Sequence, residues 1–327
     1  MIISRTPLRM SFVGGGSDLP AFYRRHGGAV LSTAIDKYVY VNINSKFDGG
    51  IRLAYSKVEE VERVEEIEHQ LVKATFEMLG LRGGVEITTI ADVPSRGTGL
   101  GSSSSFTVAL IQAISAYLGQ HISAERLGEL SCEVEIERCE EPIGKQDQYA
   151  AAFGGLNLIE FREDDSVQIT PVIMDREARA RMEERVLVFY TGITRSASGI
   201  LRKQSEMASS DDAKQAIMKR MVDLAYHLRD ELARGQIDSL GDILHENWML
   251  KRSLSKGISS GEIDAWYQLA MEAGALGGKL LGAGSGGFLL FYAPVERHDA
   301  IAKAVGLRQI KFGFEPLGSR ILFYNPN

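Results

Sequence analysis

Cysteine is scarce in this sequence of 327 residues, which contains only Cys132 and Cys139. If the segment between them is helical, their spacing in the sequence separates them by roughly 10 Å of rise, too far for a disulfide bond. We therefore do not expect a secreted protein that is held together by disulfides.

Long hydrophobic runs are also missing. No stretch approaches the ~20 consecutive apolar residues that a membrane-spanning helix needs. Residues 1–5 lack the apolar core of a signal peptide. These absences predict a cytoplasmic protein without a membrane partner.

The sequence has no excess of positive charge. It contains 37 Lys and Arg residues against 43 Asp and Glu residues, and no basic stripe interleaved with aromatic residues. Nucleic acid is therefore not an expected partner. The six histidines are scattered, so the sequence shows no His and Cys cluster typical of a metal site.

Glycine, by contrast, is abundant. The chain has 34 glycines, and many of them fall in three short stretches at 14–16, 97–101 and 277–287. Hydrophobic residues make up 44% of the chain and charged residues 24%, which is typical of a globular protein rather than a disordered one. The glycines are therefore expected to serve particular turns and close approaches of the backbone.

Hydrophobic periodicity predicts a first part rich in strands and a second part rich in helices. In the first part we expect strands over 37–43, 85–90, 154–161 and 167–173, and helices over 64–79, 102–118 and 123–138. In the second part we expect strands over 186–190, 279–281 and 288–292, two further strands at the end, and helices over 211–234, 236–254, 261–273 and 297–305. The change of pattern near 165–180 predicts a domain boundary there.

The middle glycine stretch, residues 94–105, gives the strongest functional signal. Three alternating glycines lead into four serines and then into an apolar helix. Glycines let backbone N–H groups turn inward, and the N-terminus of a helix attracts anions. The alternative is a flexible Gly/Ser loop, but such loops seldom run straight into so apolar a helix. No lysine precedes the serines, so this is not a Walker A loop.

The other two stretches are weaker signals alone. In the first, Arg9 on a strand leads to three glycines and then to Asp18, which suits sugar hydroxyls but could instead cap a short helix. In the third, the run Gly-Ala-Gly-Ser-Gly-Gly at 282–287 resembles a dinucleotide-binding motif. A strand rather than a helix follows it, which argues against a dehydrogenase and leaves a tight hairpin as the alternative.

Several carboxylates lie between the second and third stretches. On an α-helix, Glu133 and Glu137 share one face, while Glu135 points elsewhere. Asp147 follows a glycine turn and precedes a run of small residues, which predicts a buried carboxylate. Such a group can accept a proton from a substrate hydroxyl.

In combination, the three stretches resemble the three motifs of the GHMP kinases, the family of galacto-, homoserine, mevalonate and phosphomevalonate kinases. The middle motif, Pro-x-x-x-Gly-x-Gly-Leu-Gly-Ser-Ser, is the most specific. The first, Gly-Gly-Gly-Ser-Asp-Leu-Pro, is closer to the heptose 7-phosphate kinase and fucokinase-like branch than to galactokinase. Residues 144–151, 194–197 and 251–254 resemble the same branch.

The resemblance implies an α+β fold with a mixed-sheet N-terminal domain over 1–170 and a ferredoxin-like α/β C-terminal domain over 171–327. Asp147 matches the catalytic aspartate, and Arg9 matches the basic residue paired with it. ATP phosphates would be bound by Pro94, Gly97, Gly99, Leu100, Gly101, Ser102, Ser103 and Ser104. Mg²⁺ would be bound by Ser103 and Glu137, with Glu133 and Glu135 left open. The sugar would contact Gly15, Gly16, Ser17, Asp18, Lys145, Arg195, Gly284 and Gly286.

The leading hypothesis is therefore an ATP- and magnesium-dependent kinase that phosphorylates the anomeric hydroxyl of D-glycero-D-manno-heptose 7-phosphate. The alternatives are a kinase of a free sugar such as L-fucose and a nucleotide-binding regulator without catalysis. A phosphorylated substrate needs a second cationic site, for which the candidates are Arg24, Lys145, Arg195, Lys251 and Arg252. The apolar helix pattern over 217–232 is also compatible with a homodimer.

Overall fold

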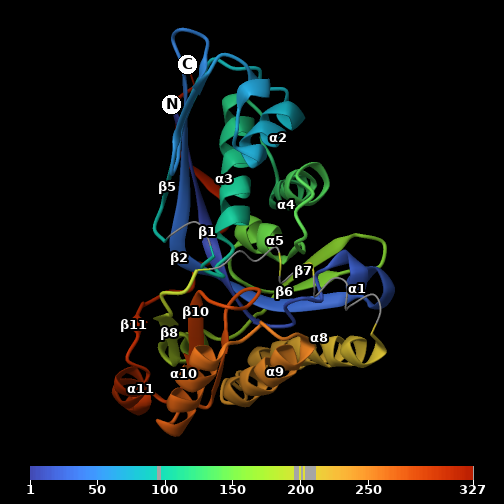
Figure 1. Cartoon of the computed structure of the whole chain (residues 1–327), viewed down its shortest axis with the longest axis vertical. Coiled ribbons are helices and arrows are strands. Elements are labelled where there is room, and N and C mark those ends of the chain that lie inside the picture. The colour runs from blue at the N-terminus through green and yellow to red at the C-terminus, as the bar shows by residue number, and fades with distance from the viewer. Residues whose placement is uncertain (94–96, 195–198, 200–201, 203–210, 327) are drawn as a thin grey trace.

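The computed structural model describes residues 1–93, 97–194, 199, 202 and 211–326. Within this part the chain forms two β-sheets, an eight-stranded sheet built mainly from the first half and a four-stranded sheet from the second (Figure 1). Helices pack on both sheets. No helix in the described residues combines the length and apolar character needed to cross a bilayer.

The larger sheet is organised around one long strand, β2 (Gly28–Ser45). One end of β2 pairs with β6 through residues 28–33, and the other pairs with β5 through residues 39–45. It therefore runs through both parts of the sheet seen in Figure 1: the upright part with β5, here called the tall arm, and the lower part with β6. The main strand order is β12-β1-β2-β5-β3-β4, with β7 pairing on β6. The other strands are β1 (Ile2–Val13), β3 (Ile51–Ala54), β4 (Val58–Val61), β5 (Val85–Ala91), β6 (Leu156–Phe161), β7 (Val167–Pro171) and β12 (Arg320–Tyr324).

The predicted helix over 102–118 is confirmed as α3 (Ser102–Tyr117). It packs against β1 and β2 and also contacts the neighbouring helices, so it is apolar on nearly all sides. This burial fixes the position of its first turn, where the glycine loop ends. The remaining helices of the first part are α1 (Pro20–His26), α2 (Gln70–Leu79), α4 (Ala124–Cys132) and α5 (Gln146–Phe153), with a short 3-10 helix at Val64–Glu66.

Two helices of the first part differ from expectation. The predicted helix over 64–79 starts as a 3-10 turn, and α2 begins only at Gln70 because Ile67 is extended and Glu59 accepts a hydrogen bond from the Glu68 backbone. The helix that Ser123 caps at its N-terminus ends as an α-helix at Cys132. It continues as a π-helix over Glu133–Arg138.

The second part confirms the ferredoxin-like prediction. Its four strands have the order β11-β8-β10-β9, with all neighbours antiparallel. Along the chain, helices follow β8 and β10, the first and third strands in sequence order. This gives the βαββαβ pattern of that fold. The strands are β8 (Val186–Tyr190), β9 (Gly277–Leu280), β10 (Phe288–Tyr292) and β11 (Arg308–Gln309). The helices are α6 (Arg176–Glu184), α8 (Asp212–Ala233), α9 (Leu240–Leu254), α10 (Gly261–Glu272) and α11 (His298–Val305), with a 3-10 helix at Val295–Arg297.

The two parts are joined by more than the chain segment near residue 180. The last strand, β12, returns to the larger sheet and pairs antiparallel with β1, with Ile2 opposite Tyr324. The predicted second domain, residues 171–327, therefore includes a strand, Arg320–Tyr324, that belongs to the larger sheet of the first part. In addition, the buried ammonium of Lys279 on β9 donates to the carbonyls of Ser11 and Phe12 on β1. Helix α8 also packs against β2, beneath the lower part of the larger sheet (Figure 1).

Candidate active site

A cleft of about 1280 Å³ lies where the two parts of the chain meet. Its walls come from β1, the loop before α3, the start of α5, the end of α9 and the loop after β9. The structure thus brings all three glycine stretches to one place. The predicted site residues that line the cleft are Arg9, Gly16, Asp18, Gly97, Gly99, Gly101, Ser102, Ser103, Ser104 and Asp147.

Arg9 and Asp147 form the best-defined contact in the cleft. The Arg9 Nε donates to Asp147 Oδ1 and a terminal nitrogen donates to Oδ2, each at 2.7 Å. The other terminal nitrogen donates to the Gly99 carbonyl at 2.6 Å. Arg9 is buried on β1, so the guanidinium fixes the Asp147 carboxylate and the glycine loop to the same strand. Two-point contacts of this kind are among the strongest polar interactions in proteins.

The glycine loop turns into α3 through left-handed backbone conformations. Gly99 has φ 76° and Gly101, which caps the helix, has φ 73°. Thr98 and Ser102 share a hydrogen bond of 3.2 Å between their hydroxyls. The first N–H groups of α3 have no partner within the helix, so its N-terminus is suited to bind an anion. This geometry fits the predicted phosphate site.

Glycine is also required where the loop meets the second part of the chain. A Cβ on Gly99 would lie 2.3 Å from the Leu281 carbonyl oxygen, and one on Gly282 would lie 2.5 Å from the Gly99 Cα. A Cβ on Gly287 would similarly lie 2.3 Å from the Thr98 carbonyl oxygen. The second and third glycine stretches therefore pack backbone against backbone.

Glu135, rather than Glu137, points into the cleft. The segment that carries these glutamates is a π-helix, so α-helical spacing does not give the directions of their side chains. Glu137 is exposed and does not line the cleft, whereas Glu135 is fully buried and lies beside Ser103. Of the three glutamates that the sequence left open, Glu135 is the one that lines the cleft, beside Ser103.

The surroundings of Glu135 hold its carboxylate in place. One oxygen accepts from Thr107 at 3.1 Å and from Ser103 at 3.4 Å, and the other accepts from Gln148 at 2.6 Å. The Ser104 hydroxyl also lies close enough to favour the charged form of this carboxylate. Burial nevertheless raises the pKa of Glu135 to about 7.

These groups fit a magnesium ion only when a ligand supplies further oxygens. In the part of the chain that the structure describes, no group of three or more His, Cys, Asp or Glu side chains could hold a metal alone. Mg²⁺ is commonly bound by one or two protein carboxylates together with substrate phosphates and water. Glu135 and the exposed Ser103 hydroxyl match that pattern at the start of α3.

Asp18 lies in the same cleft and is fully buried. It accepts hydrogen bonds from the Gly16 backbone at 3.0 Å and from the Gln146 side chain at 3.0 Å. A Cβ on Gly144 would lie only 2.0 Å from Asp18 Oδ2, so a glycine is needed there. Burial, together with the nearby Asp147, raises the pKa of Asp18. The alternative of a helix cap is wrong, because Leu19 holds the N-cap position of α1.

Lys251 is the one cation from the second part of the chain that lines the cleft within the described residues. It comes from the end of α9, and its Nζ donates to the Gly282 carbonyl at 3.0 Å. Burial lowers its pKa to about 8, although Asp18 and Asp147 favour the charged form. The sequence included Lys251 among five basic candidates without distinguishing it from the others.

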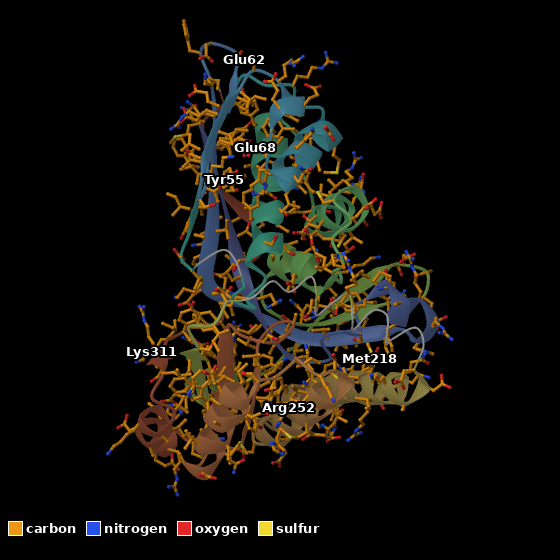
Figure 2. All side chains as sticks on the ribbon, in the orientation of Figure 1. Tyr55, Glu62, Glu68, Met218, Arg252 and Lys311 are labelled. Carbon is orange, nitrogen blue, oxygen red and sulfur yellow. The ribbon has the colours of Figure 1, made fainter. Side chains whose placement is uncertain are left out.

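Three of the other basic candidates are engaged outside the cleft. Lys145 donates to the backbone carbonyl of Asp165 at 3.0 Å. Arg24 donates to the carboxylate of the same residue at 2.9 Å. In this structure the Lys145 side chain therefore binds Asp165 and does not line the cleft, and its sugar contact stays a prediction. Arg252, also on α9 (Figure 2), pairs with Asp264 on α10 at 2.8 Å.

Other predicted residues have structural roles or lie outside the described part. The Ser17 hydroxyl donates to the Gly14 and Ala29 carbonyls, and Leu100 is buried and accepts from the Arg9 backbone. Gly284 and Gly286 do not line the cleft. Glycine is required at both positions because Gly284 packs closely against Ile258 and Gly286 against Ile193. Pro94 and Arg195 lie outside the described residues. So do the other residues of the motif at 194–197, except Thr194.

The far end of the cleft is aromatic, which the sequence did not predict. The rings of Tyr55, His69 and Phe106 pack together there. The ring centroid of His69 lies 4.8 Å from that of Tyr55 and 5.4 Å from that of Phe106. Figure 2 shows Tyr55 on the tall arm, and Glu68, which also lines the cleft, lies close by in the same view. Three separate segments supply these rings, so no local motif signals them.

Comparison with known proteins agrees with this arrangement. Residues 66–155 match the model for the GHMP kinases N terminal domain, and residues 228–307 match that for GHMP kinases C terminal. The chain is 30% identical over 316 residues to the D-glycero-alpha-D-manno-heptose 7-phosphate kinase of Campylobacter jejuni, covering 92% of each protein. It is 29% identical over 331 residues to a bifunctional fucokinase/GDP-fucose pyrophosphorylase of Arabidopsis thaliana, covering 93% of this chain and 30% of that protein.

A solved structure has a similar fold. A D-glycero-D-manno-heptose 1-phosphate kinase from Bacteriodes thetaiotaomicron superposes with a TM-score of 0.82 at 26% identity, covering 99% of this chain and 100% of that one. The similarity spans both parts of the chain, including the residues that form the cleft between them. The protein therefore belongs to the GHMP kinase family.

Proposed function

We propose that this sugar kinase transfers the γ-phosphoryl group of ATP to the anomeric hydroxyl of D-glycero-D-manno-heptose 7-phosphate, giving the 1,7-bisphosphate. The observation that carries the proposal is the two-point contact of Arg9 with Asp147 beside the glycine loop. The identities of the relatives from C. jejuni and B. thetaiotaomicron support heptose as the sugar.

The glycine loop and Glu135 would hold the nucleotide. Bound ATP and Mg²⁺ supply the phosphoryl group and neutralise its negative charge. In this chain, backbone N–H groups from 97–103 would bind the phosphates, and Ser103 and Glu135 would hold the metal. The aromatic group formed by Tyr55, His69 and Phe106 would receive the nucleobase, since flat rings suit stacking.

Asp147 would act on the sugar hydroxyl. A carboxylate can accept the hydroxyl proton as the oxygen attacks, or can orient the hydroxyl for attack. Arg9 fixes both oxygens of Asp147, so the carboxylate cannot rotate away from the glycine loop. Asp18 would accept hydrogen bonds from other hydroxyls, because its own partners leave it facing the cleft.

A free-sugar kinase is the second candidate function. It is favoured by the identity to the Arabidopsis fucokinase and by the absence of a free cation for a substrate phosphate among the described candidates Arg24, Lys145 and Arg252. Those three side chains already pair with carboxylates or carbonyls. The substrate phosphate of the heptose would then need Lys251, which lines the cleft, or Arg195, which lies outside the described residues.

A coupled assay of ADP release separates the candidates. Purified protein would be given ATP, Mg²⁺ and, in separate reactions, D-glycero-D-manno-heptose 7-phosphate, L-fucose, D-galactose and D-mannose. We expect the highest kcat/KM with the heptose phosphate. Turnover of a free sugar with no response to the heptose phosphate would reject the heptose proposal. ATP binding without turnover of any sugar would instead indicate a regulator.

A further inference from the structure

Gln146 and Lys251 lie together at the end of the cleft that holds Asp18 and Asp147, and the proposed chemistry uses neither of them. Gln146 is the first residue of α5, directly before Asp147, whereas Lys251 comes from α9. Both reach the same point beside Gly15. A Cβ on Gly15 would lie 3.5 Å from the Lys251 Nζ and 3.9 Å from the Gln146 Oε1.

The Gln146 amide has one partner and one unused acceptor. Its Nε2 donates to Asp18 Oδ2 at 3.0 Å, which fixes the orientation of the amide. Its Oε1 is buried and has no hydrogen-bond partner among the described residues. A buried acceptor without a donor is unfavourable, so this oxygen is suited to receive a hydrogen bond from a ligand.

Lys251 complements this acceptor with donors. Its ammonium carries three N–H groups, and the carbonyl of Gly282 accepts one of them. Asp18 and Asp147 lie close enough to interact with its charge. A phosphate placed here would be repelled by both carboxylates, whereas a neutral hydroxyl would not. Arg9 also acts on Lys251, so two cations and two carboxylates balance here and leave no net positive charge to attract the phosphate of a substrate.

We propose that Gln146 and Lys251 together bind the sugar hydroxyl that neighbours the reacting one, an inference that rests on the proposed function. Gln146 Oε1 accepts the proton of this hydroxyl, and Lys251 Nζ donates to its oxygen. The anomeric carbon has two polar neighbours in a sugar ring, the ring oxygen and the 2-hydroxyl. Because the ring oxygen cannot donate to Gln146, the contact selects sugars with a free 2-hydroxyl.

The experiment compares sugars with and without that hydroxyl. The probes are D-glycero-D-manno-heptose 7-phosphate, L-fucose and the 2-deoxy analogue of each. We expect wild-type kcat/KM to fall about 10- to 100-fold when the 2-hydroxyl is removed, as for a hydrogen bond to a charged or buried group. In Gln146→Met and Lys251→Met, the intact sugar should lose a similar factor, mainly through KM, and the discrimination should fall below about threefold.

Gly15→Ala tests the same point without removing either side chain. Gly15 does not have a positive φ, and the added methyl would make only ordinary contacts, so the protein should fold. The methyl would occupy space that the hydroxyl needs. Sugar affinity, measured by calorimetry without ATP, should fall about tenfold while ATP affinity stays unchanged. Gly261→Ala at the start of α10, where nothing lies within 4 Å of the new Cβ, is the matched control.

Two results would overturn the inference. One is a Gln146→Met variant whose ratio of kcat/KM between the intact and the 2-deoxy sugar equals that of the wild-type protein. The other is a loss confined to kcat in Lys251→Met with unchanged sugar affinity, which would assign Lys251 to the transferred phosphoryl group. Failure of the proposed function looks different, since the wild-type protein would then phosphorylate only a free sugar or no sugar at all. The calorimetric comparison of each sugar with its 2-deoxy analogue would still decide the hydroxyl contact.

Discussion

The guanidinium of Arg9 donates to both carboxylate oxygens of Asp147 and, through its remaining terminal nitrogen, to the Gly99 carbonyl. One buried side chain thus sets the distance between the group that would receive a proton and the loop that would hold the phosphates. Phosphoryl transfer depends mainly on such positioning, because the protein contributes little covalent chemistry.

Replacing Asp147 by Asn should lower kcat by about 10²- to 10⁴-fold, the range attributed to positioned proton acceptors. The amide keeps the size of the side chain but cannot take a proton. ATP affinity, measured by calorimetry, should stay within about twofold of wild type. Activity equal to wild type would rule out the role assigned to Asp147.

Replacing Arg9 by Lys should lower kcat/KM by about 10- to 100-fold, although the charge is kept. A lysine ammonium cannot make the two parallel bonds to Asp147 and also reach the loop. The matched control is Arg5→Lys on the same strand, where the arginine approaches Glu315 at 3.6 Å and does not line the cleft. Similar losses in both variants would show that strand stability, not the contact with Asp147, is responsible.

Replacing Glu135 by Gln should have opposite effects on stability and on metal binding. The folded pKa of about 7 lies above the ordinary value of 4.5, so the protonated carboxyl stabilises the fold below pH 4.5, and this contribution is lost as the pH rises to about 7. The amide does not titrate. Without metal, the variant should therefore gain stability relative to wild type between pH 5 and pH 8, by up to about 3 kcal/mol.

The same variant should need at least about tenfold more Mg²⁺ for half-maximal activity, because an amide is a weaker ligand than a carboxylate. Urea unfolding in EDTA and Mg²⁺ titration of activity measure the two effects. Glu137→Gln is the control, since its side chain is exposed, and it should change neither quantity. A shift in the Mg²⁺ requirement for Glu137→Gln alone would instead assign the metal to Glu137.

Replacing Gly99 by Ala should destabilise the protein more than a left-handed backbone alone explains. Gly99 and Gly119 have φ 76° and 74°, so an alanine at either position carries the same strain of about 1–2 kcal/mol. Only at Gly99 does the new Cβ meet the backbone of Leu281, whereas nothing lies within 4 Å at Gly119. Urea unfolding should show a larger loss for Gly99→Ala, and equal losses would disprove the contact between the glycine stretches.

The sequence predicted those parts of the cleft that depend on local chemistry. The alternating glycines before α3 and the position of Asp147 after a glycine turn both follow from residues next to each other in the chain. The sequence left the choice among Glu133, Glu135 and Glu137 open, because it depends on a π-helix, which periodicity does not signal. The orientation changes with one widened turn, while the composition stays the same.

Contacts between distant segments were also beyond the sequence. Lys251 and Gln146 are more than a hundred positions apart, and only the packing of α9 under the cleft brings them to Gly15. The family resemblance implied a sugar contact for Lys145, two positions before Asp147, yet its side chain turns toward Asp165. Proximity along the chain does not determine the direction of a long side chain at the start of a short helix.

The pairing of β1 with β12 has a consequence for the synthesis of the protein. The ribosome makes β1 long before Arg320–Tyr324, the strand that covers the outer edge of β1. Until then the nascent chain exposes an open edge of the larger sheet, which can pair with other chains. Completion of this sheet is therefore a late event in folding, and a chaperone that shields β1 during translation would increase the yield of native protein.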